Sequence, residues 1–136
     1  IHASDQIWTG HAVSMGNPHL VVFVGAHPDA TPLEHIARKA AETAPFPHGV
    51  NVEVARLLDS KTADVRVWER GVGETRACGS GACAVAAAAR SLGLAAKELD
   101  VRMPGGTLGV SWSGIEYDAM WLTGPARWVF SGRYGG

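Results

Sequence analysis

The sequence is poor in the residues and runs that mark several protein classes. It has two cysteines, Cys78 and Cys83, and their spacing on one short helix does not suit the Cβ geometry of a disulfide. No Cys and His cluster has the spacing of a structural zinc site. Free thiols favour a reducing compartment, and no signal peptide or bilayer-length apolar run is present. We therefore expect a cytoplasmic protein without a membrane span.

Charge is also scarce. Charged residues make up 18% of the 136 positions, and the formal net charge is −1. Nucleic acid and anionic membranes attract proteins with an excess of basic residues, so neither is expected as a partner. Apolar residues reach 46%, and 17 glycines are typical of a turn-rich β protein. The length suits one domain with its own core.

The most unusual segment is a run of small apolar residues. From Ala82 to Ala89 the only polar side chain is the thiol of Cys83. A surface helix shows one apolar stripe, whereas this one is apolar on all sides. At roughly 12 residues it is too short to span a bilayer. The sequence therefore predicts a buried helix, ending near Leu92, with a sheet wrapped around it.

The segment Cys78-Gly79-Ser80-Gly81 opens this helix. A helix amino end has unpaired N–H groups and a partial positive charge, so it binds carboxylates or phosphates and stabilises a thiolate. The glycines let a ligand approach the backbone closely. Chemistry alone leaves two interpretations of Cys78 open, a functional thiol and a small buried residue beside a helix cap.

The rest of the chain predicts an α+β fold with about eight strands and one further, outer helix. Thr31 is the expected N-cap of that helix, with Glu34 completing a capping box, and the helix ends before Pro45. The predicted strands are Gln6–Met15, Leu20–Val24, Val50–Leu58, Ala63–Arg70, Glu98–Met103, Leu108–Trp112, Ile115–Leu122 and Ala126–Ser131.

Several polar residues could act together with Cys78. Glu69 lies nine positions upstream across a glycine-broken loop that could fold back on the thiol, where a carboxylate suits general acid–base chemistry. Arg70 has the forked donor geometry that carboxylates match. Asn17 and Asn51 could add neutral hydrogen bonds, although a turn residue and a solvent-facing strand residue are the simpler interpretations. His19 is predicted at the tip of a hairpin, beside Asn17.

Four segments resemble the diaminopimelate epimerase family. They are Gly16-Asn17-Pro18-His19, Gly49-Val50-Asn51-Val52-Glu53, Trp68-Glu69-Arg70-Gly71-Val72-Gly73-Glu74-Thr75 and Ala77-Cys78-Gly79-Ser80-Gly81-Ala82. The resemblance is to the carboxy-terminal half of these enzymes and covers nearly the whole chain. It implies that residues 1–136 form a single domain equivalent to that half, with the amino-terminal half absent. The family implies a half-domain with a barrel-like sheet around a central helix, and catalysis without a cofactor.

The resemblance also implies a reaction, the interconversion of L,L- and meso-diaminopimelate by two cysteines in lysine and peptidoglycan precursor biosynthesis. Cys78 matches the cysteine of this half and Glu69 its acid–base partner, while His19 resembles the histidine that supports the other half's cysteine. The substrate-binding residues implied are Asn17, Asn51, Glu69, Arg70, and the backbone of Gly79 and Ser80. Because the second cysteine belongs to the absent half, and Cys83 is expected to be a core residue, the chain alone should be inactive.

Two other functions stay open at this point. One is another cofactor-independent racemase or isomerase of the same fold, such as a proline-racemase-like enzyme. The other is a module that binds small carboxylates without turnover. Arg70 and the two asparagines favour a substrate with a second polar head. The expected partners are diaminopimelate and the amino-terminal half, and a homodimer stays open.

Overall fold

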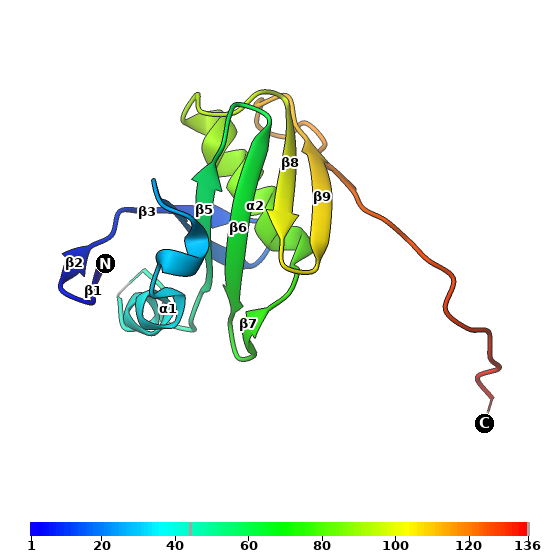
Figure 1. Ribbon diagram of the computed structural model, residues 1–136, viewed down its shortest axis with the longest axis horizontal. Coiled ribbons are helices and arrows are strands. Elements are labelled where there is room, and N and C mark those ends of the chain that lie inside the picture. Colours follow the sequence, from blue (N-terminus) through cyan, green and yellow to red (C-terminus); the bar gives the residue numbers. More distant parts are fainter. Residues whose placement is uncertain (44, 136) are drawn as a thin grey trace.

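The computed structural model describes residues 1–43 and 45–135, and its main feature is a curled, eight-stranded mixed sheet with a helix in its hollow (Figure 1). The strands are β1 (His2–Ala3), β2 (Gln6–Ile7), β3 (Gly10–Ser14), β4 (Pro18–Phe23), β5 (Asn51–Leu57), β6 (Thr62–Glu69), β7 (Gly73–Thr75), β8 (Glu98–Met103), β9 (Gly106–Ser111) and β10 (Trp121–Thr123). The helices are α1 (Leu33–Ala41), α2 (Gly79–Ser91) and the short 3₁₀ helix η1 (Pro28–Ala30).

The order of the sheet is β10-β9-β8-β6-β5-β4-β3, and β7 pairs with β6 off this path. Two neighbouring pairs are parallel, β4 with β5 and β6 with β8. Parallel neighbours need a crossover connection, and here α1 and α2 supply the two crossovers. The remaining neighbours in the sheet are antiparallel, and β1 and β2 form a separate hairpin.

The two helices cover opposite faces of the sheet. In β4, Leu20 and Val22 pack in the cluster of α1, whereas Val21 between them packs in the cluster of α2. Because successive strand residues point to opposite faces, the two clusters lie on the two sides of the sheet. The α+β half-barrel around a central helix, predicted from the sequence, is therefore confirmed.

The central helix matches the prediction closely. It begins one residue after its N-cap, Cys78, and its buried residues include Ala82 and all of Ala84–Ala89. Cys83 departs from the expectation of a fully buried residue, since it is half-buried and packs against the edge of the α2 cluster. Small side chains allow the helix to sit close to β4 and β5, where Val21 and Ala55 face it.

The start of α1 differs from the prediction. The helix begins at Leu33 with Pro32 at the N-cap position, and no side chain caps it, so the predicted capping box is wrong. Glu34 instead binds Arg38 one turn along the helix at 2.7 Å. The buried side chains Leu33 and Ile36 anchor α1 to the sheet without a cap.

The strand β5 is buried on both faces. Val52 and Val54 belong to the cluster of α1, so Asn51 and Glu53 point to the side of α2. Their exposed fractions are 6% and 0%. The interpretation of Asn51 as a solvent-facing residue is therefore wrong, because crossover helices cover both sides of this part of the sheet.

The two ends of the chain depart most from the predicted strands. Gln6–Met15 is split into β2 and β3, and Ile115–Leu122 is reduced to β10. Ala126–Ser131 forms no strand at all, and residues 124–135 leave the body as an exposed tail (Figure 1). A strand needs a neighbour for its backbone hydrogen bonds, and in the described part of the chain this tail has none.

Candidate functional site

The amino end of α2 combines a thiol with unpaired backbone donors. The Sγ atom of Cys78 accepts a hydrogen bond from the N–H of Gly81 at 3.4 Å and lies 3.5 Å from Oγ of Ser80. The N–H groups of Gly79 and Ser80 belong to the first turn, which no helix carbonyl reaches, and they find no acceptor among the described residues. Cys78, Gly79 and Ser80 are all partly exposed, so a ligand can reach this end of the helix.

Glu69 lies at the end of β6, on the approach to α2. The expected glycine-broken loop is in fact a tight hairpin, in which Glu69 pairs with Gly73 of β7. The carboxylate of Glu69 accepts a hydrogen bond from Oγ1 of Thr75 at 2.5 Å. Within the described residues, Glu69 therefore makes its side-chain hydrogen bond to Thr75 and not to Cys78.

Asn51 ties two strand ends together beside the site. Its Oδ1 accepts the backbone N–H of Arg70 at 2.8 Å, and its Nδ2 donates to the carbonyl of Pro18 at 3.2 Å. An amide nitrogen has two hydrogens, and the second one has no acceptor among the described residues. The guanidinium of Arg70 is exposed and donates to the carbonyl of His48 at 3.3 Å.

His19 is not at the tip of a hairpin, as the sequence suggested. It is the second residue of β4, paired with Asn51 of β5, and its side chain is completely buried. Its Nδ1 lies 2.7 Å from Oε1 of Glu53, and its Nε2 lies 3.1 Å from Oδ1 of Asn17. Asn17, in the turn between β3 and β4, is partly exposed and links this buried ring to the surface.

Glu53 is a member of this cluster that the sequence reasoning gave no role. Burial raises the pKa of its carboxyl, and the negative charge of Glu69 adds to this effect. The hydrogen bond and the electrostatic interaction with His19 oppose it. The signal in the sequence was a glutamate between two valines of a strand that also carries Val50. A charged residue in such a strand needs a partner if the strand is covered on both sides.

A hollow that borders α2 lies away from the amino end of this helix. A cavity of about 530 Å³ is bounded by β3, the carboxy-terminal part of α2 and the loop of residues 112–120. None of the expected site residues lines it. Among the described residues, no three His, Cys, Asp or Glu side chains are grouped so that they could hold a metal ion. The described helices include none that is long and apolar enough to cross a membrane.

The fold places the chain in a structural class. A crystal structure of a PhzF-family phenazine biosynthesis protein from Bacillus anthracis matches 85% of this chain and 38% of its own length, with a TM-score of 0.55 and 20% identity. A PhzF-family structure from Enterococcus faecalis matches 78% of this chain and 39% of its own length, with a TM-score of 0.52 and 17% identity. The chain thus has the α+β half-barrel fold that recurs in these larger proteins.

Sequence comparison identifies the family within that class. The family model of diaminopimelate epimerase matches residues 11–129, and the chain belongs to this family. The diaminopimelate epimerase of Xanthomonas axonopodis is 46% identical over 90% of this chain and 43% of its own length. That of Methanococcus maripaludis is 42% identical over 97% of this chain and 47% of its own length. The chain therefore spans about half the length of the curated relatives that it matches.

Proposed function

We propose that this chain is the carboxy-terminal catalytic half of a diaminopimelate epimerase, which interconverts the L,L and meso forms of diaminopimelate without a cofactor. The observation that carries the proposal is the thiol of Cys78 beside the unpaired N–H groups of Gly79 and Ser80. Family membership supports the reaction class, and the match to less than half of each relative supports the assignment as one half of a larger enzyme.

The amino end of α2 can hold the carboxylate at the reacting end of the substrate. Gly79 and Ser80 offer two converging N–H groups, and the helix dipole adds positive charge. A carboxylate bound there sets its α-carbon next to Cys78, whose thiolate removes the α-proton or whose thiol returns one. The same N–H groups stabilise the negative charge that develops when the proton leaves.

The residues around the β6–β7 hairpin suit the other end of the substrate. Arg70 presents an exposed guanidinium that matches a second carboxylate, and Asn51 keeps one amide hydrogen free for it. Asn17 lies at the partly exposed turn before β4. Glu69, held by Thr75, is the acid–base partner in this proposal and also contacts the distal amino group.

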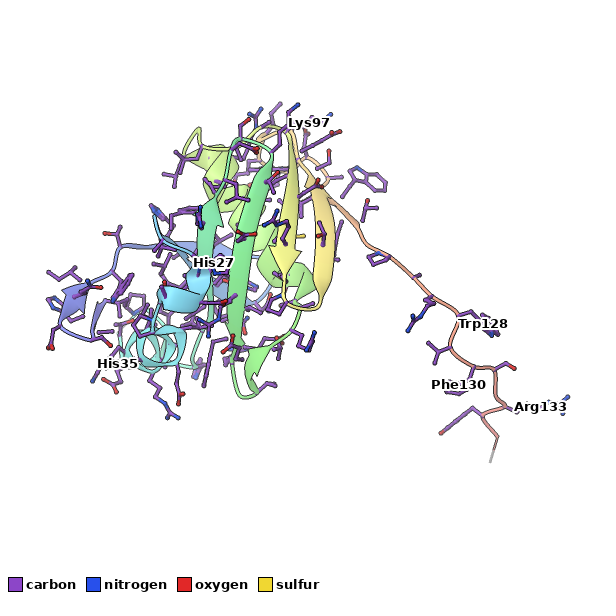
Figure 2. All side chains as sticks on the ribbon, viewed as in Figure 1. His27, His35, Lys97, Trp128, Phe130 and Arg133 are labelled. Carbon is purple, nitrogen blue, oxygen red and sulfur yellow. The ribbon has the colours of Figure 1, made fainter. Side chains whose placement is uncertain are left out.

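Inversion of a carbon centre requires an acid and a base on opposite faces of that carbon, and Cys78 can occupy only one face. The second cysteine is proposed to come from an amino-terminal half joined to this chain. The tail supports such a neighbour, because Trp128 and Phe130 are 82% and 81% exposed and lie far from the sheet (Figure 2). Exposed aromatic side chains that lie close together along the chain are typical of a surface that packs against another part of a protein.

The test compares the 136-residue chain with a protein that joins it to the expected amino-terminal half. Both are incubated with L,L-diaminopimelate in deuterated water, and NMR follows α-proton exchange and meso product. We expect the joined protein to form meso product, and the single chain to fold without forming it. Exchange without inversion by the single chain would support Cys78 as a lone base, and Cys78→Ala in the joined protein is the control.

Two outcomes would overturn the proposal. Meso product from the single chain at the rate of the joined protein would contradict the assignment as half a site. If the joined protein racemised proline but not diaminopimelate, a sibling enzyme of the same fold would be favoured. Binding of diaminopimelate without exchange by either protein would favour a carboxylate-binding module.

A further inference from the structure

A pair of completely buried ionisable groups lies on the α2 side of the sheet. His19 and Glu53 come from neighbouring strands, 34 positions apart in sequence, and both have an exposed fraction of 0%. Glutamate is almost never fully buried unless it is paired. Here Oε1 pairs with His19, and Oε2 has no hydrogen-bond partner among the described residues. Burial of an oxygen without a hydrogen-bond partner lowers the stability of the fold. Stability alone therefore does not explain why a glutamate occupies this position.

The carboxyl of Glu53 is packed against the first turn of α2. A Cβ atom placed on Gly81 would lie 2.8 Å from Oε1 of Glu53 and 3.4 Å from Sγ of Cys78. The backbone of Gly81 is helical, where glycine costs about 1 kcal/mol relative to alanine. The missing side chain at this position therefore makes room for the carboxyl, directly beneath the turn that carries the thiol.

Each nitrogen of the His19 ring faces an oxygen atom of another side chain. An ionised carboxylate can only accept, so opposite an ionised Glu53 the Nδ1 atom is the donor of the 2.7 Å hydrogen bond. Nε2 lies 3.1 Å from Oδ1 of the partly exposed Asn17, in the β3–β4 turn. That oxygen only accepts, so this contact is a hydrogen bond when Nε2 is protonated as well. The ring thus has a buried edge bound to Glu53 and a second edge directed toward the candidate site.

We propose that Glu53 is a positioning residue, which holds His19 with Nδ1–H pointing into the core and its Nε2 edge turned toward Asn17 and the site. The titratable groups that face the pair are Glu69 at the end of β6 and Cys78 at the start of α2. The proton on Nδ1 follows from its contact with an ionised Glu53. Its consequence for catalysis rests on the proposed function, in which His19 supports the cysteine of the other half.

The first experiment measures the ring directly. Long-range ¹H–¹⁵N NMR spectra of the 136-residue chain report which nitrogens of each histidine are protonated, and His19→Gln assigns the signal. We expect Nδ1 of His19 to be protonated at neutral pH. The exposed His27 and His35, which lie outside this cluster (Figure 2), serve as references in the same spectrum. A ring protonated only on Nε2 would overturn the proposal.

Three variants separate positioning from packing. Glu53→Gln keeps an oxygen that accepts from Nδ1–H and should retain the wild-type ring state. Glu53→Met has a similar length and no acceptor, and should lose it. Gly81→Ala should disturb the same signal by displacing the carboxyl. An unchanged His19 signal in Glu53→Met would overturn the proposal, and if that variant does not fold, the wild-type spectrum and Gly81→Ala still decide it.

The second experiment measures catalysis in the joined protein. Glu53→Met should lower kcat by on the order of tenfold or more with little change in KM, as for other carboxylates that orient a histidine. Glu53→Gln should fall between that variant and the wild type. Equal kcat in Glu53→Met and wild type would overturn the catalytic part. If the wild-type protein has no epimerase activity, the proposed function fails while the NMR result still decides the state of His19.

Discussion

The first turn of α2 and the remainder of the same helix lie in different environments. The first turn, Cys78–Gly81, is largely part-exposed and borders the side chains of Glu53, Met103 and Leu122. The body of the helix, Ala82–Ala89, packs in a cluster of apolar side chains from β4, β5, β8 and β9. One helix therefore supports the core along its length and presents reactive groups at its end. Changes at neighbouring positions should affect different properties.

The largest effect expected from this comparison separates the two cysteines. In the joined protein, Cys78→Ala should lower the epimerisation rate by at least about 100-fold, the lower range for loss of a general acid or base. Cys83→Ala, five positions along the same helix, should leave the rate close to wild type and cost less than about 1 kcal/mol of stability. Rates are measured by NMR and stability by urea unfolding. Similar rates in the two variants would contradict the predicted functional difference between the first turn and the body of the helix.

The body of the helix should show the opposite behaviour. Val85 is completely buried in the α2 cluster, so Val85→Ala removes two methyl groups and should cost about 2 kcal/mol of unfolding free energy. Trp128→Ala on the exposed tail is the matched control and should change the stability of the chain by less than about 0.5 kcal/mol. Urea midpoints measure both. A larger loss at Trp128 than at Val85 would mean that the tail packs on this chain.

The two thiols should also differ in reactivity. Burial, with a smaller contribution from Cys78, raises the pKa of the Cys83 thiol and so reduces its thiolate fraction. The thiolate is the form that reacts with iodoacetamide. We expect Cys78 to be alkylated several-fold faster than Cys83 in the folded chain, as measured by mass spectrometry of timed samples. Faster labelling of Cys83 would contradict the position of the helix start.

The smallest effect concerns the approach to the first turn. Arg66 holds Glu74 of β7 through two hydrogen bonds of 2.7 and 2.8 Å, and these lower the pKa of Glu74 below its ordinary 4.5. The pair is partly exposed, so Glu74→Gln should cost less than about 1 kcal/mol at neutral pH. Because the folded-state pKa is lowered, the stabilisation is present above pH 4.5 and is lost as the pH falls through the lowered value.

Urea unfolding at neutral and acidic pH measures this difference. The two proteins should converge in stability at low pH, where Glu74 is protonated in both the folded and the unfolded state. Glu42→Gln on α1, whose partner Lys39 is also exposed, is the control and should show a still smaller difference. A difference between Glu74→Gln and wild type that grows as the pH falls would contradict this assignment of the pair.

Much of the fold could be predicted because its strongest signals are local. The run of small residues after Cys78 indicated a helix buried on all sides, and the structure places its ends within one residue of the prediction. The strand Glu98–Met103 was predicted with its observed bounds. The strand predicted at Ala126–Ser131 failed because a short apolar run shows only that a segment can pair, whereas pairing also needs a neighbouring strand.

The candidate site was predictable in part for the same reason. The thiol, the two glycines and Ser80 are consecutive in sequence, so their meeting at one helix end follows from the helix itself. Glu69 lies close in sequence, but its hydrogen bond to Thr75 depends on the β6–β7 hairpin, which the glycines did not specify. The two hydrogen bonds of the Asn51 side chain, to the backbone of Pro18 and of Arg70, likewise depend on strand pairing.

The central helix, the thiol at its amino end and the α+β character of the chain follow from local sequence patterns, because composition and period act over a few neighbouring residues. The cover on both faces of β5, which buries Asn51 and Glu53, depends on how distant segments pack together. So does the contact of His19 with Glu53. That contact joins two parallel strands across the α1 crossover, and no pattern within either strand carries the information about which residues will face each other.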